Sequence, residues 1–240
     1  MKHVITFLAL SLFLLSTVQA QVSPTPKTDD LTVKEAKVRY LKDLDLLVFE
    51  QKVRGKAGGT LPSAAGQMDE APVLGYVFPT TLEPADVGFK DVEGIVALAV
   101  TSHPDFDDTP LWDENNNDQY DDDGTIFHTH WVVLGQDNRV PGGLSVKEIK
   151  AEDAASVLPP TAPGMPMYLD SPGHAIILER NTIRVVVPRY RISGKRSFNY
   201  DAVTAYMEVN TSDSSRPLLG VYEVYSVLSG DLSLPYTVSK

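Results

Sequence analysis

The chain has 240 residues, no cysteine and a formal net charge of −11. The lack of cysteine excludes disulfides, thiolate metal ligands and cysteine nucleophiles, so any metal site must use histidine, carboxylate, amide or backbone oxygen. The acidic balance makes nucleic acid and anionic membrane surfaces poor partners.

The first twenty residues have the pattern of a secretory signal peptide. Lys2 precedes an apolar run from Val4 to Leu15, and Val18-Gln19-Ala20 forms a small-residue cleavage site. We therefore expect an exported protein, periplasmic or extracellular. No later run approaches the ~18 apolar residues of a spanning helix, so we expect no membrane span. The sequence predicts a signal peptide over 1–20, a disordered leader over 21–33 and one β-sandwich domain over 34–240.

The first half of that domain has the alternation typical of strands. Residues 34–55 predict two strands, paired as a hairpin, with a helix over 32–42 as the alternative. Residues 73–79 form a short aromatic strand that ends at a proline. The continuous apolar run 93–102 predicts a central strand, and a strand over 125–134 follows a long acidic loop.

The second half contains the best helix candidate, which is short, at 146–157, and a proline-rich loop at 159–166. Five further strands are predicted, at 167–169, 175–178, 182–192, 202–209 and 218–228. This pattern predicts an all-β fold, an antiparallel β-sandwich or jelly roll with long irregular loops and at most one short helix.

The acidic loop concentrates charge. Residues 104–127 hold nine carboxylates and no lysine or arginine. Crowded carboxylates repel one another, and Ca²⁺ is a natural neutraliser because it takes ~6–8 oxygen ligands. The order of residues does not match an EF-hand, and a solvated loop that needs no ion is the alternative. The predicted calcium ligands are Asp113, Asn115, Asn117, Asp118, Asp121 and Asp123.

His128 and His130 are two residues apart on the strand that follows, so their side chains share one face of the sheet. Two imidazoles held in this way can bind Zn²⁺ or Cu²⁺ if a third ligand comes from elsewhere. His103, at the end of the preceding strand, is the nearer candidate, and His174 is the other. The alternative is a pair of hydrogen-bonded histidines without a metal.

The sequence FHTHW at 127–131 resembles the FHxHW strand of α-type carbonic anhydrases, which implies zinc on two histidines so spaced. The His-x-His pair, with Pro172-Gly173-His174, also resembles the motifs of metal-dependent cupins. The chain lacks the third-histidine segment of the first family and the glutamate that follows the pair in the second.

These features leave three hypotheses. The first is a divalent-metal-binding protein with a calcium-type loop and a histidine site. The second is a zinc- or copper-dependent hydrolase or lyase in which the histidine site keeps an open position. The third is a calcium-dependent carbohydrate-binding or adhesion module that uses Trp112, Tyr120 and Trp131 as a stacking platform.

Overall fold

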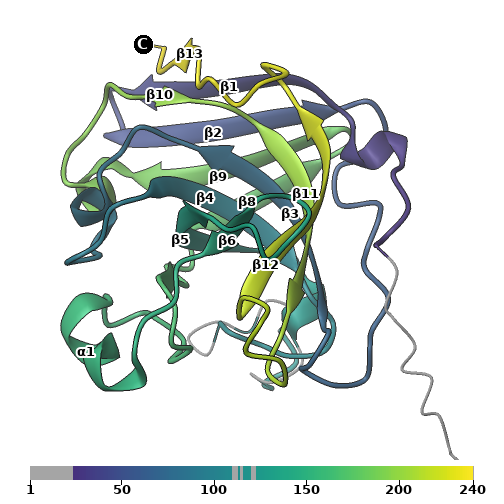
Figure 1. Cartoon of the computed structure of the whole chain (residues 1–240). Helices are drawn as coiled ribbons and strands as arrows, with labels where there is room; N and C mark the ends of the chain where they lie inside the picture. The colour runs from purple at the N-terminus through teal and green to yellow at the C-terminus, as the bar shows by residue number, and fades with distance from the viewer. Residues whose placement is uncertain (1–23, 110–112, 114–115, 120–122, 240) are drawn as a thin grey trace, which may run out of the picture.

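The computed structural model describes residues 24–109, 113, 116–119 and 123–239. The fold is nearly all β, with antiparallel sheets and one short helix, α1 (Ala154–Val157), as the sequence predicts (Figure 1). The strands are β1 (Val33–Leu41), β2 (Leu46–Val53), β3 (Pro72–Pro79), β4 (Ile95–Ser102), β5 (His128–Gln136), β6 (Leu144–Val146), β7 (Leu169–Asp170), β8 (Ala175–Glu179), β9 (Thr182–Pro188), β10 (Asn199–Tyr200), β11 (Val203–Val209), β12 (Leu219–Val227) and β13 (Tyr236–Thr237).

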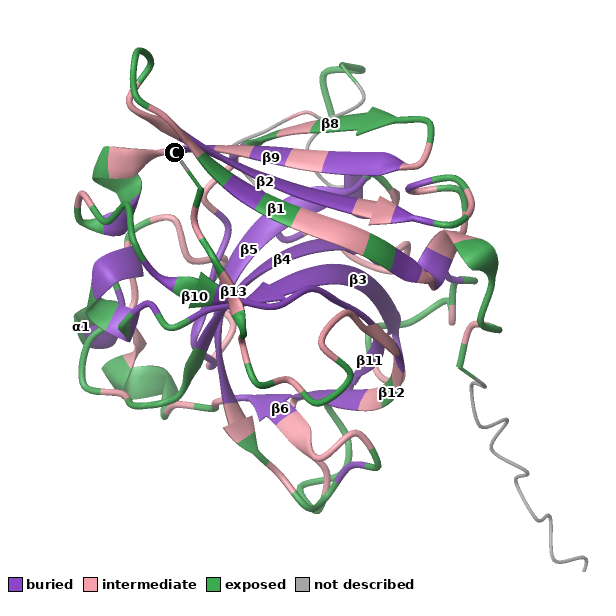
Figure 2. Cartoon of the chain, turned by 90° about the horizontal axis from the view of Figure 1, so that it is seen from above, coloured by how far each residue is buried: buried purple, intermediate pink, exposed green. Residues whose placement is uncertain are grey.

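The larger sheet closes into a six-stranded barrel. Its strand order is β4-β3-β11-β12-β6-β5-β7, and β4 also pairs with β5. Closure removes the unpaired edges of β4 and β5, which an open sandwich would have to protect in another way. Figure 2 shows β3, β4, β5, β6, β11 and β12 arranged around the barrel.

A four-stranded sheet, in the order β1-β2-β9-β8, packs against one side of the barrel (Figure 2). Phe49 of β2 contacts Phe78 of β3 and Trp131 of β5 edge to face, with ring centroids 5.4 and 6.3 Å apart. Aromatic pairs in this geometry contribute about 0.5–1.5 kcal/mol each beyond the area they bury. The barrel therefore has apolar side chains on both faces of these strands.

Strand β4 shows this arrangement in its sequence. Val96, Leu98 and Val100 belong to the core between barrel and sheet, whereas Ala97 and Ala99 belong to the core inside the barrel. Because both faces are covered, the strand is a continuous apolar run rather than an alternating one. The sequence predicts a central strand here, and the structure adds that the second face lines a barrel.

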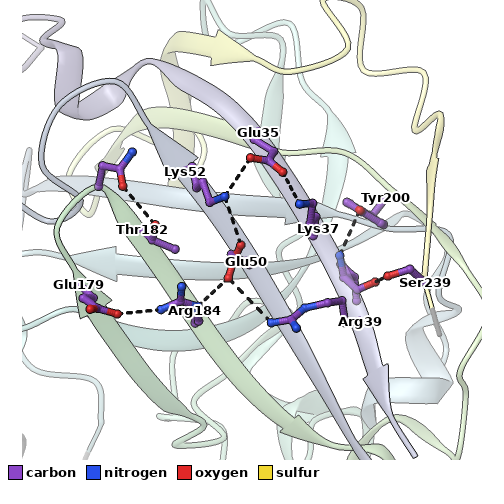
Figure 3. A network of polar contacts seen from close by, with 12 residues as sticks. Glu35, Lys37, Arg39, Glu50, Lys52, Glu179, Thr182, Arg184, Tyr200 and Ser239 are labelled. Atoms are coloured by element: carbon purple, nitrogen blue, oxygen red, sulfur yellow. Dashed lines mark hydrogen bonds and ion pairs between the residues drawn. The ribbon is translucent and has the colours of Figure 1, made fainter.

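The other face of the four-stranded sheet carries charged side chains (Figure 3). Arg184 Nε donates a 2.6 Å hydrogen bond to Glu50, and Arg39 and Lys52 each approach the Glu50 carboxylate within 3.9 Å. Three cations around one nearly buried carboxylate offset the cost of its burial. These charged side chains show that this face of the sheet is directed toward solvent.

The predicted hairpin over 34–55 is confirmed, because β1 and β2 pair antiparallel with Leu41 opposite Leu46. The predicted helix over 146–157 is reduced to α1, preceded by a 3-10 turn at Ala151–Asp153. Residues 24–32, part of the expected disordered leader, lie against the barrel. The Tyr225 hydroxyl donates to the Thr25 carbonyl, and Leu31 is fully buried.

No helix in the described ranges is long and apolar enough to cross a membrane. The predicted signal peptide lies outside the described residues.

Candidate metal centre

Two histidines of β5 face the interior of the barrel. His130 lies opposite Ala99 of β4, and His128 lies opposite Thr101. Both histidines are buried, with 2 % and 3 % of their surface exposed. Alternation along the strand turns Thr129 and Trp131 to the other face, toward the four-stranded sheet. Period-two geometry therefore delivers two imidazoles to one end of the barrel.

A close crossing of two loops brings in a third histidine. The His103 N–H, just after β4, donates a 2.7 Å hydrogen bond to the Gly124 carbonyl. A Cβ atom at Gly124 would lie 2.0 Å from the Phe106 carbonyl oxygen and 2.3 Å from that of His103. Only glycine permits this approach, which fixes His103 beside the start of β5.

The fourth member of the cluster is Asp108, from the acidic loop. Its Oδ1 lies 3.3 Å from His103 Nε2, 3.1 Å from His128 Nε2 and 3.5 Å from His130 Nε2. One ligand atom from each of these four buried residues lies within 4.8 Å of all the others. The acidic loop therefore supplies one of its carboxylates to the histidine site.

The outer nitrogens of the rings have partners that orient them. His103 Nδ1 lies 2.8 Å from the Phe106 carbonyl, and His128 Nδ1 lies 2.6 Å from the Ile126 carbonyl. A carbonyl only accepts, so each Nδ1 carries a hydrogen, and when the ring is neutral its Nε2 has a free lone pair. The Ser171 hydroxyl lies 3.1 Å from His130 Nδ1. Metal-binding histidines are held by outer partners of this type.

The two Nε2 atoms of His103 and His128 are only 2.8 Å apart. Two lone pairs at this distance repel each other unless a proton or a cation lies between them. His130 Nε2 and Asp108 Oδ1 are buried and have no hydrogen-bond partner among the described residues. Such atoms are costly in a folded protein, and a bound cation would satisfy all four together.

Charge in the site suits a cation. Burial works to raise the pKa of Asp108, but the neighbouring imidazoles outweigh it and hold that pKa well below its usual value. Burial lowers the pKa of His130 to about 3. Burial also works to lower the pKa of His103, but the negative charge of Asp108, 3.3 Å away, outweighs it and raises that pKa. Metal ligation needs an ionised carboxylate and neutral imidazoles, so Asp108 and His130 are already in the required state, whereas His103 would release a proton when an ion binds.

The donor set also fits in size and chemistry. Four ligands about 2.0–2.1 Å from a tetrahedral ion lie roughly 3.3–3.4 Å from one another. The Asp108 Oδ1 distances of 3.1–3.5 Å surround that value, whereas His103 Nε2 and His128 Nε2, 2.8 Å apart, would have to separate by about half an ångström. Three imidazoles and one carboxylate suit Zn²⁺ or Cu²⁺, whereas Ca²⁺ prefers oxygen alone.

His174 is not in this cluster. Its Nε2 accepts a 3.2 Å hydrogen bond from Trp131 Nε1, and its N–H donates to Thr129 Oγ1 at 3.0 Å. Both partners are residues of β5 that alternate with the two histidines of the cluster. Burial lowers the pKa of His174 to about 4. Of the two candidates for a third ligand, the structure brings His103 to the site and gives His174 a packing role.

The predicted calcium ligands that the structure describes lie outside the four-residue cluster. Asp113 accepts hydrogen bonds from the N–H groups of Asn117, at 3.0 Å, and Asp118, at 2.7 Å. Asp123 is buried in a 3-10 turn, outside the four-residue cluster. Asn115 and Asp121 lie outside the described residues. The calcium site therefore stays a prediction.

One of the three residues of the predicted aromatic platform is buried. Trp131 is 1 % exposed and packs between β5 and the four-stranded sheet, so it cannot stack on a sugar at the surface. Trp112 and Tyr120 lie outside the described residues.

Sequence reasoning did not single out Asp108. It is one of nine carboxylates between residues 104 and 127, and only the path of the loop distinguishes it from its neighbours. Its position five residues after His103 is a weak signal, because it fits no periodic element.

Comparison with known proteins gives no match to a protein-family model, to a curated protein or to a solved structure.

Proposed function

We propose that the protein is an exported metal-binding protein that holds one transition-metal ion, zinc or copper, on His103, Asp108, His128 and His130. The observation that carries this proposal is the cluster itself: four buried residues place one ligand atom each within 4.8 Å of all the others, and His130 Nε2 among them has no hydrogen-bond partner in the described part of the chain. Export rests on the predicted signal peptide alone.

Four protein ligands favour binding over catalysis. Catalytic zinc sites usually keep three protein ligands and one open position, whereas closed sites hold the metal for structure or storage. Asp108 occupies the place that a reactive water would need. A metal-binding role is therefore the first candidate.

The second candidate is a zinc- or copper-dependent hydrolase or lyase. It is favoured by one observation: His103, Asp108 and His130 line a cavity inside the barrel, so a small molecule could reach the ion. Expansion of the coordination shell to five ligands would make room for it. Hydration and ester-hydrolysis assays on the zinc-loaded protein test this candidate.

The proposal includes a separate calcium site in the acidic loop. It is supported by the carboxylates of residues 104–127 that the histidine cluster does not use. The double variant Asp121→Ala, Asp123→Ala should abolish any stabilisation by calcium. A melting shift with calcium equal to that of the wild type would remove this part of the proposal.

Metal content tests the histidine site directly. The double variant His128→Gln, His130→Gln should bind no zinc or copper after loading and desalting, whereas the wild type should hold one equivalent. His174→Gln is the matched control, because it changes a buried histidine outside the cluster. Equal metal content in the double variant and the wild type would contradict the proposal, provided that circular dichroism shows both to be folded.

A further inference from the structure

A cavity of about 90 Å³ lies inside the barrel. Most of its wall is aliphatic, and alanines on two strands, Ala99 of β4 and Ala205 of β11, leave space where larger side chains would fill the interior. A site for one water needs only about 10–15 Å³, so this space is large enough for a small molecule. The aliphatic part of such a cavity tends to stay dry.

One end of the cavity is polar. The side chains of His103, Asp108, His130 and Thr101 line it there. The Thr101 hydroxyl is buried and has no hydrogen-bond partner in the described part of the chain, and neither has His130 Nε2. An unpaired hydroxyl beside a metal centre, under an otherwise aliphatic wall, indicates a place for a ligand with one polar end.

The segment between β12 and β13, which starts beside the first residues of β11, also lines the cavity. Leu232 and Leu234 line the cavity from this segment, and both have a left-handed backbone, with φ of 59° and 54°. Leucine rarely adopts this conformation, so the surrounding structure must hold it. Asp201 contributes by accepting hydrogen bonds from the N–H and the hydroxyl of Ser229, where the segment begins. The cavity thus has leucines of this segment in its aliphatic wall and the candidate metal centre at its polar end.

We propose that the barrel interior binds a small amphiphilic molecule, a short-chain carboxylic acid, with its carboxylate at the metal and Thr101 and its alkyl chain along the aliphatic wall. This inference rests on the proposed metal site. With neutral imidazoles, a divalent ion and Asp108 leave one net positive charge, which one carboxylate neutralises. The cavity is smaller than the ~150 Å³ that accepts benzene, which limits the chain to a few carbons.

Titration of the zinc-loaded full-length protein with butyrate and with acetate tests the proposal. Butyrate carries two more methylene groups than acetate, and their burial should make it bind about 15-fold more tightly. Cobalt-loaded protein provides a second readout, because a carboxylate that enters the coordination shell changes the visible spectrum. Equal affinity for the two acids, or an unchanged spectrum, would overturn the inference.

Ala205→Leu fills the interior from β11, which carries no metal ligand, and should abolish butyrate binding while one zinc is retained. Ala155→Leu, on the exposed surface of α1, is the matched control and should bind both. If Ala205→Leu does not fold, the ratio of the wild-type affinities for butyrate and acetate still tests the inference. Zinc without butyrate selectivity overturns this inference alone, whereas a wild type that holds no metal overturns the proposed function and the inference together.

Discussion

Replacement of Asp108 by asparagine tests the centre with little change in shape. The amide would keep the size of the side chain but would lose the charge that lies 3.1–3.5 Å from three imidazole nitrogens. Removal of an outer partner of a metal ligand typically costs 10–100-fold in affinity. Because Asp108 is placed as a direct ligand, we expect Asp108→Asn to weaken zinc binding by at least about 100-fold.

The expected size of the effect follows from linkage. At free zinc near 100 times the wild-type Kd, binding stabilises the fold by about 2.7 kcal/mol. For a chain of 240 residues, each kcal/mol raises the melting temperature by about 2–4 °C, so wild-type protein should gain roughly 5–11 °C. In Asp108→Asn the same zinc concentration is near Kd, which leaves about 0.4 kcal/mol and about 1–2 °C.

Thermal unfolding followed by circular dichroism, with and without zinc, measures both shifts. Asp107→Asn is the matched control. Asp107 Oδ1 accepts 2.8 Å hydrogen bonds from the N–H and the hydroxyl of Thr109, which an asparagine oxygen can also accept. This control should keep the wild-type shift. An Asp108→Asn chain that gains as much from zinc as the wild type would refute the role of Asp108 as a ligand.

Three further changes have defined outcomes. Gly124→Ala should abolish the zinc-dependent rise in melting temperature, because its Cβ would lie 2.0 Å from a backbone oxygen. Gly135→Ala is the control and should keep that rise, because its Cβ meets only the side chain of a lysine, 3.1 Å away, which can move. Equal rises in the two variants would contradict the close crossing of the two loops at Gly124. Burial lowers the folded-state pKa of His174 from 6.5 to about 4, so its contribution is complete above about pH 6.5 and is lost as pH falls toward 4. The unfolding free energy of His174→Gln should therefore fall by up to about 3 kcal/mol less than that of the wild type between pH 6.5 and 4. Chemical denaturation at several pH values from 4 to 7 measures this, and the same dependence on pH in both proteins would argue against the prediction. Tyr76→Phe removes the hydroxyl that accepts a 2.9 Å hydrogen bond from the Gly58 N–H and should cost about 1–3 kcal/mol in urea unfolding; an unaltered midpoint would mean that water replaces the hydroxyl.

The sequence carried most of the information about the strand that bears two of the candidate metal ligands. His128 and His130 are two residues apart, so they share one face of the strand in any kind of sheet, because side chains alternate along a strand. The position of His103 at the end of the preceding apolar run also pointed to the site, since β4 and β5 pair directly. Local periodicity was enough for His128 and His130, whereas the choice between His103 and His174 depended on the pairing of β4 with β5, which the structure supplies.

Asp108 could not be identified in the same way. Its place depends on the close approach at Gly124 and on the path of an irregular loop, and neither has a period that a sequence displays. Barrel closure was missed for a related reason. A strand covered on both faces has the same apolar pattern in a sandwich as in a barrel, and only the pairing of β4 with β5 distinguishes the two.

Elemental analysis by mass spectrometry of the full chain, purified without an affinity tag or chelator, tests the metal centre most directly. The four-residue cluster predicts one equivalent of zinc or copper per chain, either as purified or after loading and desalting. A folded protein that holds neither metal under both conditions would contradict the central claim.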